Sequence, residues 1–439
     1  MKLNNKRTIL VGFAFLSICA FWQLYDNLVP IILTETFKIG ESVAGMIMAS
    51  DNVLALFLLP LFGGFSDRCK SRLGRRRPFI LFGTIAAVTL MMALPLLTDS
   101  FNAQPASWKA VCFILALAML LVSMGTYRSP AVALMPDVTP KPLRSKANAI
   151  INLMGALGGI IYLILTTFLY KTTGDEYVSY FPLFAIVGGI MLLALVVLML
   201  FVNEPKLAKE QKEFEIAHPE YNVTEKTESG EALPKEVKRS LAFLLVSIAL
   251  WFIGYNGVTT WFSKYAIQSW NMSLGQANTC LTIATAGAIV SYIPIGSIAS
   301  KIGRRKTIRF GTILLASSFF ASFVYTMLSD KFSPVLYLLF VLVGIAWAAI
   351  NVNSLPMVVE MCKGSEVGKF TGLYYTFSMS AQIATPIVAG WLLENVDFKT
   401  LFPYAAIFVF ASFITMGFVK HGDNKIEVKR GLEAFDVED

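Results

Sequence analysis

The sequence predicts an all-α polytopic membrane protein with twelve transmembrane helices in two pseudo-symmetric six-helix halves. Hydrophobic residues make up 56% of the 439 residues and charged residues only 15%, whereas ordinary soluble domains carry about 25% charged residues. The mean hydropathy is +0.63. Apolar runs repeatedly reach the roughly 20 residues that a helix needs to cross ~30 Å of hydrocarbon. The twelve predicted spans cover residues 9–34, 43–64, 79–97, 108–136, 147–170, 180–202, 241–263, 275–299, 307–327, 334–358, 370–393 and 400–420.

The first apolar run is predicted to be a span and not a cleavable signal peptide. It is longer than a typical signal-peptide core, it has no obvious small-residue cleavage site, and another span follows at once. The strands of a membrane barrel would instead give segments of about ten residues with alternating hydrophobicity, and the sequence lacks them.

The basic residues predict the orientation of the spans. If the N-terminus is cytoplasmic, 30 of the 37 Lys and Arg residues lie in the connections and adjacent span ends on that side, 6 lie in those on the opposite side, and Arg128 lies well within a span. Such an excess marks the cytoplasmic side. We therefore expect a multi-pass protein of the cell (inner) membrane with both termini cytoplasmic. The same distribution accounts for the net charge of +8, so nucleic-acid binding is not needed to explain it. Such binding requires an extended basic face with aromatic or helical elements that contact the bases.

A long polar stretch divides the chain. Residues 203–239 are rich in acids and bases and poor in apolar residues, which is typical of a mobile linker. The predicted domains are therefore an N-terminal half over 1–202, a cytoplasmic linker over 203–240, a C-terminal half over 241–420 and a cytoplasmic tail over 421–439.

The two halves repeat each other in sequence. Span 2 runs into GGFSDRCKSRLGRRRPF at 63–79, and span 8 ends in GSIASKIGRRK at 296–306. Span 4 contains RSPAVALMPD at 128–137, and span 10 contains NVNSLPMVVE at 351–360, with a carboxylate at the same offset. Matching elements in two six-span halves indicate a transporter that rocks one half against the other around a central site.

These motifs resemble the major facilitator superfamily over the whole chain. The long spacing in SDRCKSRLGRRRPF is similar to that of plant sucrose–proton symporters and their animal and bacterial relatives. The pieces YRSPAVALMPD, WFIGYNGV, INVNSLPMVVEM and GLYYTFSMSAQIATP resemble the bacterial branch of that group, within the glycoside–pentoside–hexuronide:cation symporters. The resemblance implies alternating access between the halves and a sugar as substrate.

Three charged residues stand out because they lie well inside predicted spans and not at their ends: Asp26, Asp51 and Arg128. Each charge at mid-membrane costs about 2.5–3.5 kcal/mol on insertion scales, so such charges suggest function. The two histidines, His218 and His421, fall in cytoplasmic segments, so a proton carrier in the membrane must be a carboxylate. Asp51 is the first choice and Asp26 the second, with Arg128 tuning the acid or binding hydroxyls. The alternative for Asp51 is a structural ion pair with Arg128.

The resemblance adds one candidate acid and one departure. Plant relatives carry an acid in the motif that contains Asp137, which makes Asp137 a further coupling candidate. Bacterial relatives often carry glutamate where this chain has Thr259. The protein therefore either uses another acid or works as a facilitator.

Candidate substrate residues are aromatic and amide side chains within spans. Sugars need aromatic faces for stacking and polar groups for their hydroxyls in a mostly apolar cavity. Membrane-interface belts and helix–helix hydrogen bonds are the alternative roles of such residues. The candidates are Trp22, Gln23, Tyr25, Asn27, Tyr127, Asn148, Asn152, Trp251, Tyr255, Asn256, Asn351, Asn353, Tyr374, Tyr375 and Gln382.

The motif at 63–79 is interpreted as part of a cytoplasmic gate. Gly63 and Gly64 leave room for close packing of span 2 on a neighbour, and Asp67 can face a helix N-terminus or an arginine across the interface between halves. The other gate candidates are Arg68, Arg75, Arg76, Arg304, Arg305 and Glu360.

The sequence contains no enzyme motif. It has no Gly-x-Ser-x-Gly elbow, no phosphate-binding loop and no metal-ligand spacing, so we expect no cofactor, no metal and no ATP-driven step. The predicted function is proton-coupled import of a sucrose- or maltose-like disaccharide or small glycoside by a monomer, with sodium open as the coupling ion. The alternatives are a proton-coupled drug exporter, favoured by an apolar cavity with few amides, and a non-transporting membrane sensor.

Overall fold

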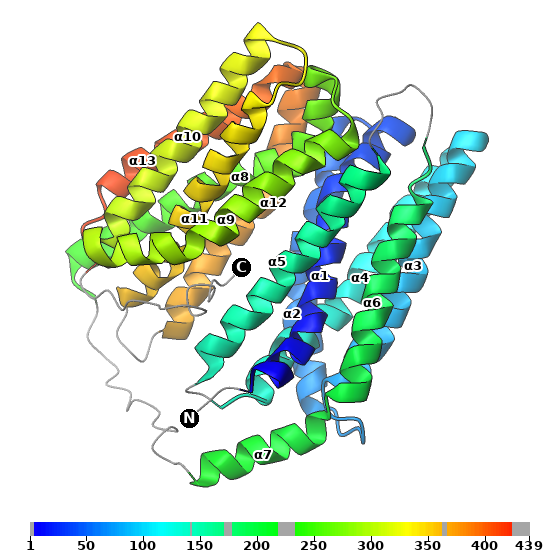
Figure 1. The fold of residues 1–439 in the computed structure, drawn as a ribbon, viewed down its shortest axis with the longest axis vertical. Helices are drawn as coiled ribbons and strands as arrows, with labels where there is room; N and C mark the ends of the chain where they lie inside the picture. Colours follow the sequence, from blue (N-terminus) through cyan, green and yellow to red (C-terminus); the bar gives the residue numbers. More distant parts are fainter. Residues whose placement is uncertain (1–3, 141–142, 171–177, 218–232, 362–366, 424–439) are drawn as a thin grey trace. The chain divides into compact units, whose positions relative to one another are not determined.

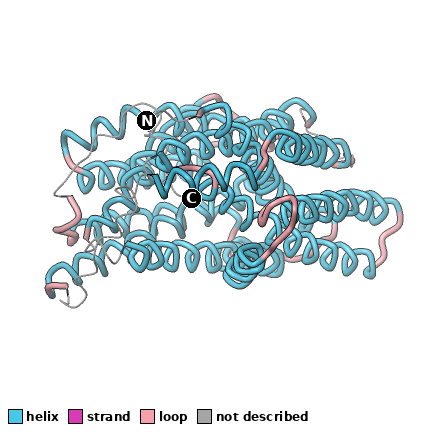
Figure 2. Tube along the Cα trace, turned by 90° about the horizontal axis from the view of Figure 1, so that it is seen from below, coloured by secondary structure: helices cyan, strands magenta, loops and turns pink. Residues whose placement is uncertain are grey.

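The computed structural model describes residues 4–140, 143–170, 178–217, 233–361 and 367–423, and its regular elements there are all helical. A π-helical turn, Ile32–Thr36, extends the first helix, and a 3-10 turn, Phe398–Thr400, precedes the last. Figure 2 shows the helices joined mostly by short loops. The long helices are α1 (Asn5–Ile31), α2 (Glu41–Arg68), α3 (Arg77–Ala103), α4 (Ser107–Asp137), α5 (Arg144–Leu169), α6 (Phe181–Phe201), α8 (Lys235–Trp270), α9 (Leu274–Ile302), α10 (Arg304–Leu328), α11 (Val335–Glu360), α12 (Val367–Asn395) and α13 (Leu401–Gly417).

Each predicted span coincides with one of these long helices, so the predicted fold class is confirmed. Among the described residues, eleven helical segments are long and apolar enough to cross a membrane. The remaining long helix, α12, falls outside that group because Thr, Ser, Tyr and Gln side chains interrupt its apolar sequence. The chain is therefore a multi-pass membrane protein.

The described residues form two compact units. The first is drawn from 1–39, 50–169 and 174–222, and the second from 40–49, 170–173 and 223–439. In the first unit α1 packs on α5 and α6, while α3 packs on α4 and α6. In the second unit α8 packs on α12 and α13, while α10 packs on α11 and α13 (Figure 1). The same order of pairing in both units is what the predicted internal repeat requires.

Part of the predicted linker is helical. Helix α7, Glu204–Ala217, follows α6 directly, whereas the polar composition of 203–239 had indicated a mobile segment. Two contacts hold α7 in place: Glu204 is buried against the start of α3, and Glu210 pairs with Arg7 of α1 at 3.0 Å. The predicted boundary at 240 also shifts, because α8 begins at Lys235. Residues 218–232 lie outside the described part of the chain.

Two glycines define the start of corresponding helices in the two units. Gly74, with φ +111°, precedes α3, and Gly303, with φ +98°, precedes α10. This left-handed region favours glycine because a Cβ would be strained there. A Cβ at Gly74 would also collide with the carboxylate of Glu204, and one at Gly303 with that of Asp423.

Large apolar side chains cover the outer surfaces of the helices. Leu200 is 73% exposed and Leu328 is 81% exposed. In a soluble protein such exposure would be costly, but lipid tails are as apolar as these side chains. Several buried positions instead carry polar residues, among them Asn27 and Asn353.

Candidate functional site

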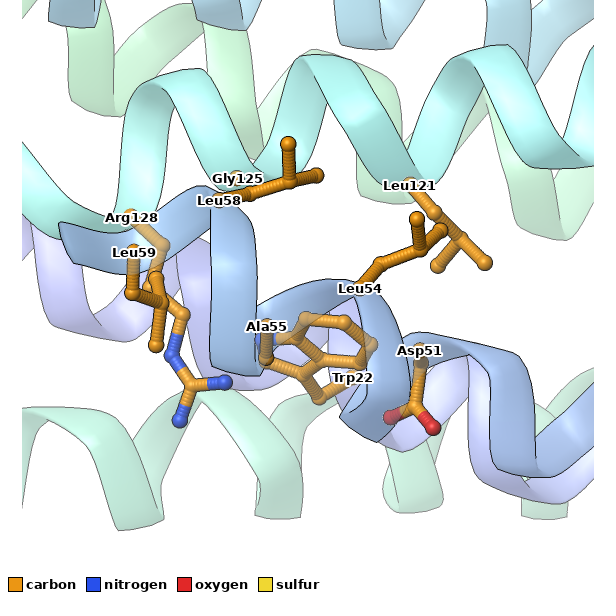
Figure 3. Close-up of a pocket in the computed structure, with 9 residues that line it drawn as sticks. All are labelled: Trp22, Asp51, Leu54, Ala55, Leu58, Leu59, Leu121, Gly125 and Arg128. Atoms are coloured by element: carbon orange, nitrogen blue, oxygen red, sulfur yellow. The ribbon is translucent and has the colours of Figure 1, made fainter. Parts of the chain in front are cut away.

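A small pocket in the first unit brings together two charged residues and a tryptophan from three helices (Figure 3). Trp22 comes from α1, Asp51 from α2 and Arg128 from α4. Apolar side chains form the rest of the wall, so the charges lie in surroundings of low polarity where electrostatic interactions are strong. The other lining residues are Leu54, Ala55, Leu58, Leu59, Leu121 and Gly125.

The indole of Trp22 lies between the two charged groups of this pocket (Figure 3). The Arg128 guanidinium carbon is 5.4 Å from the centroid of the Trp22 ring, within the range of a cation–π interaction. The Asp51 carboxylate accepts a hydrogen bond from the Asn52 amide at 2.8 Å. Across the part of the chain that the structure describes, no ion pair joins Arg128 to a carboxylate. The structural Asp51–Arg128 pair considered from the sequence is therefore not formed.

Asp26 of α1 belongs to the same charged cluster. It interacts electrostatically with Asp51 and with Arg128. The cluster thus holds two carboxylates and one guanidinium, and its charge changes by one when either acid takes up a proton.

Several polar candidates of the first unit form hydrogen bonds between helices. Asn27 accepts a hydrogen bond from the Tyr162 hydroxyl at 2.9 Å, which joins α1 to α5. The Tyr127 hydroxyl contacts Ser17 and donates to the Ala14 carbonyl at 3.0 Å, which joins α4 to α1. These polar groups stabilise helix packing in this conformation. Of the remaining candidates, Tyr25 is buried, and Gln23, Asn148 and Asn152 are half-buried.

Aromatic residues form a stack in the second unit. The rings of Tyr255 in α8 and Trp347 in α11 lie 3.7 Å apart and nearly parallel, at 4°. Phe252 packs edge-on against Trp347 at 5.4 Å and also contacts Tyr374. Sequence reasoning missed Trp347, although its place four residues before Asn351 puts both on one face of α11.

Three side-chain donors of the candidate residues are buried and have no hydrogen-bond partner among the described residues. They are the Trp22 Nε1 in the first unit and, in the second, the Trp251 Nε1 and the Asn256 Nδ2. Buried donors are usually paired, and unpaired ones often mark a place for a water or ligand.

The other second-unit candidates differ in their surroundings. Asn353 donates to the Ala349 carbonyl at 2.9 Å, and the Tyr374 hydroxyl lies 3.2 Å from that of Ser354. Asn351 is buried, while Tyr375 and Gln382 are half-buried.

Arg76 is the centre of a charged network in the connection after α2. Its Nε donates to Asp137 of α4 at 2.8 Å, its Nη2 pairs with Asp67 at 2.5 Å, and its Nη1 contacts Ser66. Arg75 pairs with the other oxygen of Asp137 at 2.8 Å. Burial lowers the pKa of Arg76, but the charges and hydrogen bonds of Asp137 and Asp67 outweigh that effect and raise it. The guanidinium therefore stays charged.

Glu204 caps the helix that follows this network. Its carboxylate accepts hydrogen bonds from the backbone N–H groups of Arg75, Arg76 and Arg77 at 2.8–3.1 Å. These are orphan donors at the start of α3, where the helix dipole also favours negative charge. Glu204 is only 2% exposed.

The second unit repeats this arrangement with different residues. Arg304 at the start of α10 contacts Glu360 at the end of α11, and its backbone N–H donates to Asp423 at 2.6 Å. Arg305 donates to the Gly417 carbonyl at the end of α13 at 2.7 Å. The sequence predicted Arg304, Arg305 and Glu360 but missed Asp423 and its counterpart Glu204. One feature of the sequence could have indicated both acids, because each of them follows the sixth span of its half.

In the motif at 63–79, the close contact expected of Gly63 and Gly64 is found only for Gly63, and Asp67 has an arginine partner. A Cβ at Gly63 would lie 3.0 Å from the Ser129 hydroxyl of α4, whereas one at Gly64 would meet no atom within 4 Å in the described structure. The arginine partner of Asp67 is Arg76 of the same connection. Arg68 is exposed.

Comparison with known proteins agrees with this architecture. The model of the Major Facilitator Superfamily matches residues 11–273 and again 263–435. Two sucrose transport proteins are similar to part of the chain. SUT3 of Oryza sativa subsp. indica is 33% identical over 152 residues, covering 32% of this chain and 30% of that protein. SUC3 of Arabidopsis thaliana is 33% identical over 153 residues, covering 32% of this chain and 25% of that protein. The chain thus matches less than a third of the length of these relatives.

Two solved structures are similar over most of the chain. A D-xylose-proton symporter has a TM-score of 0.68 at 14% identity, covering 94% of this chain and 98% of that chain. A bacterial homologue of the iron transporter ferroportin, in an inward-facing state, has a TM-score of 0.69 at 12% identity, with the same coverage. At these identities the likeness shows the fold alone.

Proposed function

The chain belongs to the Major Facilitator Superfamily, and from this premise we propose that it imports a disaccharide or small glycoside together with protons. The family and the absence of any enzyme motif in the sequence make the chain a transporter and not an enzyme. The mechanism is alternating access, in which the two six-helix halves expose one central site to each side of the membrane in turn.

The substrate class is supported by the polar and aromatic groups of the two units. The sucrose transport proteins similar to this chain share a stretch of about a third of its length. A sugar ring stacks on aromatic faces such as the Tyr255–Trp347 pair. Its hydroxyls accept hydrogen bonds from the buried donors of Trp22, Trp251 and Asn256. These polar groups favour a sugar over the apolar cargo of a drug exporter.

The pocket of Asp51, Trp22 and Arg128 supports proton coupling. It is the main observation on which the proposal rests. Asp51 carries the coupled proton, because its carboxylate is half-buried and has no cation partner within ion-pair distance among the described residues. Asp26 is the second acid of the cluster, and Arg128 provides the positive charge that substrate hydroxyls can contact. Asp137, by contrast, is held by Arg75 and Arg76, which favours a structural role for it.

The network around Arg76 and its counterpart around Arg304 are proposed to form the cytoplasmic gate. Each network joins the start of one helix to the ends of two others. Breaking one would therefore loosen several helix ends at once. We also propose that both termini face the cytoplasm and that the protein lies in the inner membrane, which the excess of basic residues on this side supports.

The decisive experiment reconstitutes the purified chain in vesicles that contain a pH-sensitive dye. A panel of mono- and disaccharides is added outside, with sodium-free and sodium-containing buffers as separate arms. The proposal predicts acidification of the vesicle interior that depends on one class of sugar and does not need sodium. Sugar uptake without proton movement would make the protein a facilitator, and uptake of apolar cations instead of sugar would make it a drug transporter.

A further inference from the structure

Arg309 of α10 is a charged residue that the proposed transport cycle does not use. Its guanidinium carbon lies 4.7 Å from the centroid of the Phe413 ring on the neighbouring helix α13 (Figure 1). Among the described residues its Nε is buried without a partner, and its guanidinium donates no hydrogen bond. The two arginines before it in α10 differ, because Arg304 contacts Glu360 and Arg305 donates to the Gly417 carbonyl.

The surroundings of Arg309 are those of a lipid-facing surface. Phe410 is 46% exposed and stacks on Phe413 with the ring centroids 6.0 Å apart. Phe310 and Ile414 are also exposed, on α10 and α13. In a membrane span such side chains meet acyl chains. Arg309 lies five residues from the start of α10, which is about 8 Å along the helix, so its long side chain can reach the level of the headgroups.

A second arginine at the same end of α13 has a similar environment. The Arg239 guanidinium carbon lies 5.7 Å from the centroid of the Phe243 ring on α8, and Phe243 in turn stacks on Phe418 at 5.0 Å. Phe418 is 53% exposed. An arginine of α8 and one of α10 thus each lie over an aromatic ring.

We propose that Arg309, held on the Phe413 ring, binds the phosphate of an anionic phospholipid headgroup. Stacking on a ring occupies only one face of the guanidinium and leaves its in-plane N–H groups free for a phosphate. The basic residues predict this end of α10 to be cytoplasmic, and that leaflet carries the anionic lipids. Arg239 provides a second contact for the same class of lipid. The site is independent of sugar transport.

The test measures lipid binding to the purified full chain in neutral detergent. The ligands are phosphatidylglycerol, phosphatidylcholine and inorganic phosphate, and the readouts are native mass spectrometry and the thermal unfolding midpoint. We expect phosphatidylglycerol to bind and to raise the midpoint, and the other two to have little effect. The Arg309→Gln variant should bind phosphatidylglycerol about tenfold more weakly, because a charge-assisted hydrogen bond is lost.

Two further variants keep the test decisive. Lys306→Gln removes the same charge from an exposed side chain at the same helix end, and its affinity should stay within about twofold of the original. Phe413→Leu keeps Arg309 but removes the ring, and should also weaken binding. Equal binding by Arg309→Gln and the unmodified chain would overturn the proposal. So would equal stabilisation by inorganic phosphate, which would make the site one for a free anion.

Discussion

The Arg128 guanidinium carbon lies 5.4 Å from the centroid of the Trp22 ring, and the same indole separates Arg128 from the Asp51 carboxylate (Figure 3). A cation–π interaction stabilises such an arrangement by about 0.5–2 kcal/mol. This interaction offsets part of the free-energy cost of placing the Arg128 guanidinium in a membrane span, where no carboxylate of the described residues forms an ion pair with it. The Asp51 carboxylate is thereby left available for a proton.

Replacing Trp22 should weaken sugar binding and should remove the ring that holds Arg128 in position. We expect Trp22→Ala to raise the KM for sugar about tenfold, because a stacking face and a buried donor are lost. Trp22→Phe keeps an aromatic face over Arg128 and should lose less. Initial rates of sugar uptake in vesicles give the KM of each of the two variants. An unchanged KM in Trp22→Ala would exclude Trp22 from the substrate site.

The Glu204 carboxylate should contribute measurably to stability. Glu204→Gln removes the negative charge that faces three backbone N–H groups, and should lower the free energy of unfolding by about 1–3 kcal/mol. Glu210→Gln is the matched control on the same helix, because its pair with Arg7 is exposed and is worth about 0–1 kcal/mol. Thermal unfolding in detergent compares them. Equal midpoints for the two variants would contradict the capping role.

The two acids that contact Arg76 should have different effects when replaced. Asp67 is 57% exposed and Asp137 only 16%. Asp67→Ala should therefore leave the fold and the sugar KM nearly unchanged but slow turnover, because it weakens the gate. Asp137→Asn should also lower the unfolding midpoint, since it leaves a largely buried guanidinium short of a partner.

Uptake kinetics and thermal unfolding, measured on both variants, separate the effect on turnover from the effect on stability. Lys70→Gln, at an exposed position of the same connection, serves as the control. Weaker sugar binding with normal turnover in Asp67→Ala would argue against a gate.

The Tyr255–Trp347 stack should contribute to sugar affinity. Trp347→Ala removes one ring of a pair whose centroids lie 3.7 Å apart, and should weaken sugar binding about tenfold. Trp347→Phe should restore part of the affinity. Trp391→Ala, at an exposed position of α12, serves as the control and should bind sugar normally. Titration calorimetry measures all three. Normal binding by Trp347→Ala would limit the stack to a packing role.

The helices were predictable because the thickness of the bilayer dictates the length of each apolar run. Asp26, Asp51 and Arg128 were predictable for the related reason that charges inside spans are costly. Helix α7 was not, because its polar composition is also that of a linker. The contacts that hold it, such as those of Glu204 with the start of α3 and of Glu210 with Arg7, join residues far apart in sequence.

The remaining differences depend on contacts between residues far apart in sequence. Glu204 and Asp423 were missed because their one sequence signal, an acid after the sixth span of each half, lies in polar stretches that contain many other acids. Trp347 was missed because a tryptophan in an apolar span is typical of a lipid-facing anchor. For Asn27 and Tyr127 the sequence left two roles open, substrate contact and hydrogen bonds to neighbouring helices, and the structure shows the second.

The most direct test compares sugar-dependent proton uptake in vesicles of the unmodified chain and of Asp51→Asn, with equal amounts of protein. Asparagine keeps the size of the side chain but cannot carry a proton. We expect that Asp51→Asn still binds sugar and equilibrates it across the membrane, yet no longer moves protons or accumulates sugar against its gradient. Undiminished proton-coupled accumulation by Asp51→Asn would show that Asp51 does not carry the coupled proton.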